Sequence, residues 1–210
     1  MLLGYNGCMP IAPIMLEGRH VRLEPLTQAH FAALAEIAFD PELWRLSTAQ
    51  VATEADLHAY IDAALALQQA GTVLPWVTRE KSSDKIVGST RFLDIQPAHK
   101  NLEIGATWLA RPWQGTGLNT EAKYLQLRYA FEQWGAMRVA LKTHHENLRS
   151  QAAMRAIGAR PEGVFRNHMV MPGGGIRHSV WFGITREEWP QVKIVLQKRM
   201  QRFFGDDCVN

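Results

Sequence analysis

Two adjoining pieces of sequence decide the fold: Leu102-Glu-Ile-Gly-Ala-Thr-Trp-Leu109, and then Arg111-Pro-Trp-Gln-Gly-Thr-Gly-Leu-Asn-Thr-Glu-Ala122. In the first piece, apolar residues alternate with other residues, which is the two-residue period of a strand with one apolar face. The apolar set is Leu102, Ile104, Ala106 and Trp108. We therefore expect a central strand in which Glu103 points away from the core.

The second piece predicts a tight turn and the start of a helix. Pro112, Gly115 and Gly117 mark the turn, and apolar residues then recur at three- and four-residue spacing from about Asn119 or Thr120 onward. The first turn of a helix has N–H groups without internal partners and a partial positive charge, so it can bind a phosphate. An ordinary strand-to-helix turn would show the same pattern, and the spacing alone leaves both interpretations open.

Periodicity along the rest of the chain predicts an alternation of strands and helices. The predicted strands are 19–26, 73–79, 86–93, 138–143, 162–168 and 177–184. The predicted helices begin directly after Thr27, which can cap the first one, and near Thr53, Asn147 and Glu187. Such an order is typical of a mixed sheet covered by helices.

Several motifs resemble those of the GNAT superfamily of acyl-CoA-dependent N-acyltransferases. Gln114-Gly-Thr-Gly-Leu-Asn119 resembles the family's Gln/Arg-x-x-Gly-x-Gly/Ala pyrophosphate loop, although Asn119 stands where Gly or Ala is usual. The surrounding segments resemble the branch of the Rim-type ribosomal-protein N-terminal acetyltransferases, from roughly Leu16 to Trp189. These segments are Leu-Glu-Ile-Gly at 102–105, Thr-Glu-Ala at 120–122, Asn-x-x-Ser at 147–150 and Ile-Gly-Ala at 157–159.

The resemblance implies a single-domain α/β (α+β) fold of the GNAT type. Its sheet would be central, mixed and mostly antiparallel, with about five flanking helices. We expect this N-acyltransferase domain at residues 14–203, between tails at 1–13 and 204–210.

The activity implied is transfer of acetyl from acetyl-CoA to a primary amine, by direct attack in a ternary complex. The acceptor would be a protein N-terminus or a small molecule. Transfer of another acyl group, such as succinyl, is a second hypothesis. A third is a CoA-binding regulatory module without turnover, because Met154 stands where many family members have a tyrosine that acts as the acid.

By resemblance, the CoA-binding residues come from the central strand, the loop and the helix after the next strand. They are Thr107, Trp108, Leu109, Gln114, Gly115, Thr116, Gly117, Leu118, Asn119, Thr120, Asn147 and Arg149. Backbone N–H groups at 107–109 would stabilise the oxyanion that forms during transfer.

Glu103 and Ser150 are the candidate catalytic residues. An alkylamine is mostly protonated at neutral pH, and Glu103 could take its proton through water. Glu103 could instead only bond a neighbouring strand or an arginine, and His99, His144 and His145 are alternative bases. By resemblance Ser150 would meet the leaving sulfur, although a serine in a first helical turn is also an ordinary local cap.

Trp44 and Arg45 are the candidate acceptor contacts, because they lie between the first two helices, which border the acceptor site in the family. Trp44 could equally be a packing anchor between those helices.

Composition limits the other functions and locations that the sequence could indicate. The chain has 210 residues, and Lys and Arg exceed Asp and Glu by only three, so the sequence gives no reason to expect nucleic-acid binding. Two terminal thiols, Cys8 and Cys208, make no disulfide framework, and no metal-ligand spacing is present. No signal peptide or membrane span is evident, so we expect a cytoplasmic protein. Apolar strand edges near the C-terminus leave a homodimer open.

Overall fold

The computed structural model describes residues 11–205, and its centre is an eight-stranded sheet with the order β1-β2-β3-β4-β5-β6-β8-β7. All neighbouring strands are antiparallel except β5 and β6, which are parallel. The strands are β1 (Leu16–Glu17), β2 (Val21–Pro25), β3 (Leu74–Glu80), β4 (Lys85–Gln96), β5 (Asn101–Leu109), β6 (Arg138–His144), β7 (Arg160–Val170) and β8 (Ile176–Thr185).

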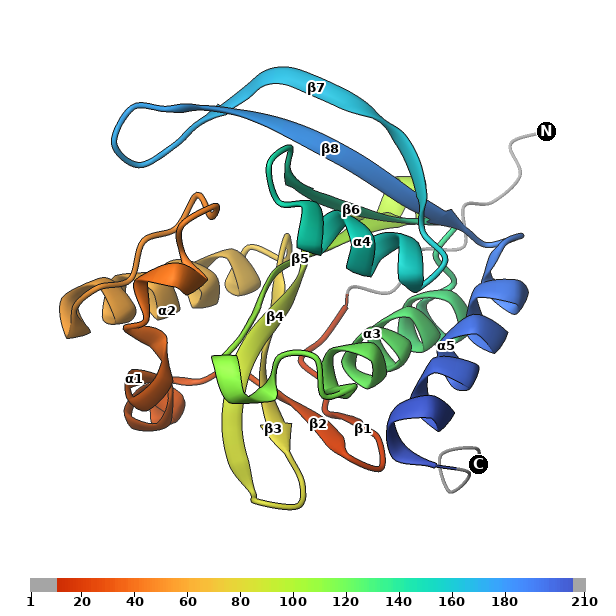
Figure 1. Cartoon of the computed structure of the whole chain (residues 1–210), viewed down its shortest axis with the longest axis horizontal. Coiled ribbons are helices and arrows are strands. Elements are labelled where there is room, and N and C mark those ends of the chain that lie inside the picture. The colour runs from red at the N-terminus through yellow and green to blue at the C-terminus, as the bar shows by residue number, and fades with distance from the viewer. Residues whose placement is uncertain (1–10, 206–210) are drawn as a thin grey trace.

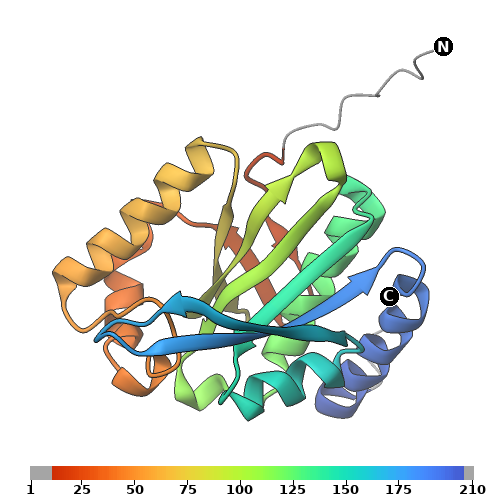
Figure 2. The ribbon, with the colours of Figure 1, turned by 90° about the horizontal axis from the view of Figure 1, so that it is seen from above.

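Helices cover both faces of this sheet. Helices α1 (Phe31–Ala38) and α2 (Glu54–Gln69) lie on one side, and α3 (Leu118–Arg128), α4 (Leu148–Ala156) and α5 (Trp189–Phe204) lie on the other (Figures 1 and 2). A π-helical segment, Tyr129–Trp134, continues α3. Each layer of helices buries its own apolar cluster against the sheet.

The fold predicted from the sequence is confirmed, and most differences concern the ends of elements. Strands β4 and β7 extend further than their alternation indicated, and the short β1 was not expected. Helix α3 begins at Leu118, earlier than predicted, because Gly117 adopts a φ of 92° and serves as the N-cap. Both cysteines lie outside the described residues.

The central strand departs from the regular alternation that the sequence predicted. Ala106 has a φ of 46°, and the pairing of β4 with β5 moves from Arg91 opposite Gly105 to Ser89 opposite Trp108. This bulge leaves two residues of β5 facing one residue of β4 and reverses the side-chain phase. Trp108 therefore packs on the α1–α2 side rather than in the cluster that holds Leu102 and Ile104.

The parallel pairing of β5 and β6 is short. It joins residues 101–103 to residues 138–140, and no further pair joins these two strands in the described part of the chain. The edge of β5 that faces β6 is thus free of ladder bonds from Ile104 onward. A gap between strands with unpaired backbone groups can receive an extended ligand.

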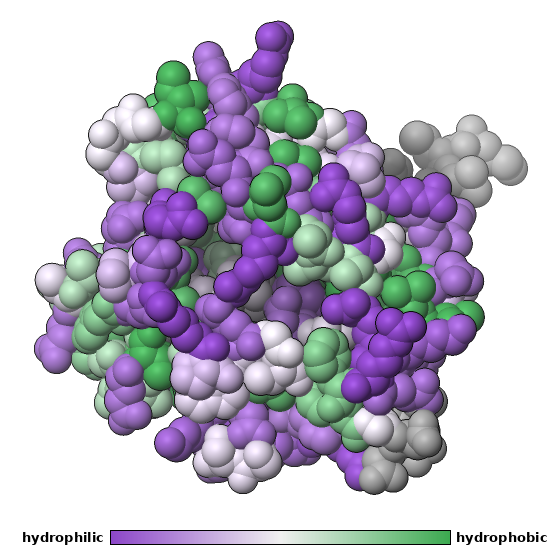
Figure 3. Space-filling view, in the orientation of Figure 1, coloured by the Kyte–Doolittle hydropathy of each residue, from purple (hydrophilic) through white to green (hydrophobic). Residues whose placement is uncertain are grey.

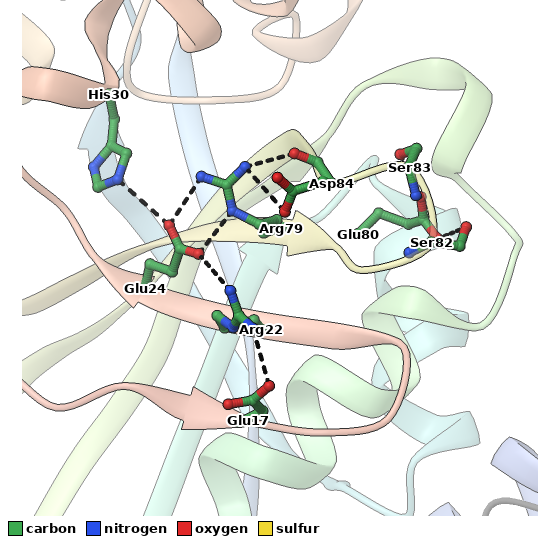
Figure 4. Close-up of polar contacts among 9 residues, drawn as sticks. All are labelled: Glu17, Arg22, Glu24, His30, Arg79, Glu80, Ser82, Ser83 and Asp84. Carbon is green, nitrogen blue, oxygen red and sulfur yellow. Dashed lines mark hydrogen bonds and ion pairs between the residues drawn. The ribbon is translucent and has the colours of Figure 1, made fainter.

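An ion-pair network ties β2 to β3, away from this gap (Figure 4). Glu24 accepts hydrogen bonds from Arg79 Nε at 2.7 Å and from Nη2 at 3.1 Å, and Arg22 and His30 also lie within 4 Å. The hydrogen bond from Arg79 holds the pKa of Glu24 below its ordinary value. These charges hold β2 and β3 together and take no part in the gap between β5 and β6.

Over residues 11–205, no helix combines the length and the apolar character that crossing a membrane requires.

Candidate active site

The loop between β5 and α3 presents unpaired backbone donors. The first helical bond of α3 runs from Glu121 N–H to Gly117 O at 3.1 Å, so the N–H groups of residues 118–120 have no acceptor within the helix. The loop also depends on glycine at 117, because a Cβ there would lie 2.7 Å from Phe203 of α5. The start of α3 is therefore a place where an anion is stabilised.

Polar side chains connect this loop to the start of α4. Gln114 Nε2 donates to Leu109 O at 2.6 Å, and the exposed Arg149 donates from Nη2 to Gln114 Oε1 at 2.6 Å. Arg149 thus adds a guanidinium next to the loop, as expected for a phosphate contact. Three of the predicted cofactor residues, Leu109, Gln114 and Arg149, are thereby linked by hydrogen bonds.

Asn119, which stands where the family usually has Gly or Ala, does not cap α3. Gly117 occupies the N-cap position, which places Asn119 within the first turn. Its Oδ1 is buried without a hydrogen-bond partner among residues 11–205.

On β5, the predicted residue Thr107 belongs to the bulge, and Trp108 and Leu109 follow it. Thr107 is exposed, whereas the side chains of Trp108 and Leu109 are buried in the two cores. Adjacent residues of a strand direct their N–H groups to opposite edges, and Ala110 N–H bonds Val87 O of β4. The Leu109 N–H is therefore directed to the free edge of β5, as expected for a donor to an oxyanion, whereas the Trp108 N–H is directed to β4.

Glu103 lies at the head of the gap, where the pairing of β5 with β6 ends. It is 3% exposed and forms an ion pair with Lys142 of β6, and its Oε1 would lie 2.8 Å from a Cβ at Gly105. Burial raises the pKa of Glu103, and the charge of Lys142 opposes that rise. A carboxylate with a raised pKa is a stronger base, but an ion pair with a basic neighbour is also the local role that the sequence left open.

Asn147 and Ser150 lie at the start of α4. Asn147 Oδ1 accepts the Ser150 N–H at 3.0 Å, so Asn147 is the N-cap of this helix. Ser150 is half-buried, and its place in the first turn matches the local role that the sequence left open. Met154 packs against the larger core, a position that serves packing.

The three histidine alternatives lie in different surroundings. His99 is exposed in the turn before β5, at the end far from the bulge. His144 is buried, which lowers its pKa, and its Nδ1 accepts the Glu146 N–H at 3.1 Å. His145 stacks on His144.

The two candidate acceptor contacts differ. Trp44 is 2% exposed, donates from Nε1 to Ala38 O at 2.7 Å and packs on Trp108, which favours its role as a packing anchor. Arg45 is exposed and pairs with Glu42. In Figure 3 the surface is hollowed between α2 and the central strands, beneath the β7–β8 hairpin.

Sequence reasoning missed Lys123 and Lys142. Lys123 precedes Leu127 and Phe131 by four and eight residues, so its position on the apolar stripe of α3 was the available signal. It is 5% exposed, and burial lowers its pKa to about 7. Lys142 lies on the polar face of β6, where a surface lysine would look the same in sequence.

These features fit CoA. The free edge of β5 suits an extended pantetheine chain, and the start of α3 with Arg149 suits a pyrophosphate. Among the residues that the structure describes, no three His, Cys, Asp or Glu side chains gather as a metal site would require.

Comparison with known proteins decides the family. The model of the acetyltransferase (GNAT) domain matches residues 20–160, more than half of the chain. The chain belongs to the GNAT acetyltransferases. Its catalytic class is therefore acetyl transfer, and family members use acetyl-CoA.

Individual GNAT relatives agree with this assignment. A Bacillus subtilis protein named as a candidate ribosomal N-acetyltransferase, YdaF, is 29% identical over 105 residues. That match spans 50% of this chain and 56% of YdaF. The structure of a candidate acetyltransferase from T. thermophilus has 38% identity and a TM-score of 0.82, over 91% of this chain and 99% of that one.

A more distant GNAT structure shares the fold. Mycobacterium smegmatis RimJ, solved in complex with CoA-disulfide, superimposes with a TM-score of 0.75 at 23% identity. The alignment covers 88% of this chain and 93% of RimJ.

Proposed function

We propose that this GNAT protein transfers acetyl from acetyl-CoA to the α-amino group of a protein. The observation that carries the proposal is the placement of Glu103 at the head of the free edge of β5, with the loop of α3 at its other end. Support for a protein acceptor comes from the ribosomal name that YdaF carries.

Each residue has a task that follows from the chemistry. When bound, acetyl-CoA supplies a thioester carbonyl that an amine can attack. Glu103 takes the proton of the incoming ammonium through water, and burial strengthens it as a base. The Leu109 N–H after the bulge stabilises the negative charge on the carbonyl oxygen. Ser150 donates a hydrogen bond to the departing sulfur.

Binding and orientation fall to the loop and α4. The N–H groups at the start of α3 and the Arg149 guanidinium hold the pyrophosphate. Asn147 fixes the first turn of α4 and thereby the position of Ser150.

A peptide assay tests this proposal. The protein is incubated with acetyl-CoA and a panel of synthetic peptides with free N-termini, and mass spectrometry measures addition of one acetyl group. The same peptides with blocked N-termini but free lysines are the control, and spermidine represents small amines. Acetylation of free N-termini only is expected. Acetylation of spermidine alone would contradict the protein acceptor, and turnover with succinyl-CoA only would contradict the acyl group.

Glu103→Gln separates binding from catalysis in the same assay. We expect CoA binding by calorimetry to persist while acetylation falls by about 10² or more. Unchanged acetylation in this variant would remove Glu103 from the mechanism.

A further inference from the structure

The buried ammonium group of Lys123, on α3, contacts the strands β4 and β5. Its Nζ donates to Thr90 Oγ1 at 3.0 Å, to Thr107 Oγ1 at 2.8 Å and to Gln126 Oε1 at 2.9 Å. Thr90 and Gln126 are fully buried, whereas Thr107 is exposed. Lys123 thus connects the interior of the protein with the surface on which we place the cofactor.

The three acceptors match the three N–H donors of an ammonium. No carboxylate pairs with Lys123 among the described residues, and burial alone accounts for its lowered pKa. Gln126 turns its carbonyl oxygen to Lys123, and its Nε2 is then buried without a partner among these residues. The three oxygens therefore hold the Lys123 amino group in one place.

The two threonines are the residues that face each other across the bulge. Thr90 is the β4 residue between Ser89 and Arg91, and it is opposite the bulged pair Ala106 and Thr107. The hydroxyl oxygens of Thr90 and Thr107 lie 2.7 Å apart. By bonding both hydroxyls, Lys123 fixes the two strands at the point where the regular ladder is interrupted.

We propose that Lys123 is the positioning residue of the acyl site, holding the bulge of β5 through Thr90 and Thr107 so that the Leu109 N–H after it faces the thioester carbonyl. The hydrogen bonds of Lys123 to the two threonines fix this part of β5 before negative charge develops on the carbonyl oxygen. Donors that are fixed in advance stabilise such a charge more than donors that must reorganise. This inference rests on the proposed function, because it needs the carbonyl to lie at this bulge.

Difference infrared spectroscopy tests the proposal. It measures the frequency of the carbonyl stretch of bound acetyl-CoA that is labelled with ¹³C at the thioester carbonyl. In the native protein we expect the stretch to move to lower frequency than in water, because fixed donors polarise the bond. In Lys123→Met we expect the shift to be lost while calorimetry shows CoA binding unchanged. Acetylation should then fall by about tenfold or more.

Two threonine variants keep the test decisive where Lys123→Met does not fold. Thr107→Val preserves shape but removes the hydroxyl, so it should lose the infrared shift, and Thr107→Ser should retain it. Lys85→Met is the matched control, because Lys85 is an exposed lysine at the start of β4. This control should behave as the native protein does.

The outcomes distinguish the inference from the proposed function. A native protein that binds neither CoA nor acetyl-CoA would overturn the proposed function. A native protein that binds both without any infrared shift, or a shift that persists in Lys123→Met and Thr107→Val, would overturn the role of Lys123 alone.

Discussion

Replacement of Lys123 by methionine should change how the stability of the protein depends on pH. Lysine ordinarily titrates near ~10.4, and burial lowers the pKa of Lys123 to about 7 in the folded protein. Between these values the unfolded chain binds more protons than the folded one, so this group makes the free energy of unfolding rise with pH by about 1.4 kcal/mol per pH unit. Over the whole window the difference approaches ~5 kcal/mol.

The sign of this pH dependence of stability follows from the direction in which the pKa of Lys123 changes on folding. Below about pH 7 both states are protonated and the folded state bears the full cost of the buried charge. Above the unfolded value both states are neutral and the cost disappears. The Met side chain has no proton to bind, so the variant should lack this dependence, although it leaves the hydroxyls of Thr90 and Thr107 without their donor.

Urea unfolding at pH 7, 8 and 9 measures the effect. The native free energy of unfolding should rise by about 2 to 3 kcal/mol more than that of Lys123→Met across this range. Lys85→Met should follow the native curve. Parallel curves for the native protein and Lys123→Met would refute the reasoning, because they would mean that Lys123 titrates alike in both states.

Three other results are expected. Gly117→Ala should weaken CoA binding in calorimetry more than Gly115→Ala, since both glycines have positive φ but only a Cβ at 117 would lie 2.7 Å from Phe203; equal losses would remove the α5 contact from the explanation. Glu24→Gln should lower the free energy of unfolding at pH 7 by about 1 to 3 kcal/mol through its lost bonds to Arg79. Because the pKa of Glu24 is lowered, that difference should shrink as pH falls through the folded value, and a constant difference would contradict it. Arg149→Met should weaken binding of CoA, which carries phosphates, more than binding of pantetheine, which carries none, and equal losses would place Arg149 away from the phosphates.

Much of the fold could be predicted from the sequence because its period is regular. The alternation at 102–105 and the three- and four-residue spacing after Gly117 report directly on one buried face. The bulge at Ala106 could not be predicted in this way, since alanine carries no signal for a φ of 46°. Its effect was to move Trp108 into the other core.

Part of the candidate site could likewise be predicted from the sequence, and part could not. The glycines of the loop and the cap at Asn147 could be located because sequence motifs report on local backbone needs. The partners of Glu103 and Lys123 come from distant strands, and no local pattern shows that Lys142 or Thr90 will meet them. Trp44 illustrates the reverse case, because an aromatic residue in a loop looks like a ligand contact until its burial is known.

The contact of Gly117 with Phe203 joins the phosphate loop to the final helix, far away in the sequence. Closing the chain between them into a loop costs conformational entropy, which the contacts made on docking must offset. The phosphate loop would therefore reach its native shape only once α5 has docked. Recovery of CoA binding would then time this docking, which makes the cofactor a reporter of one step of folding.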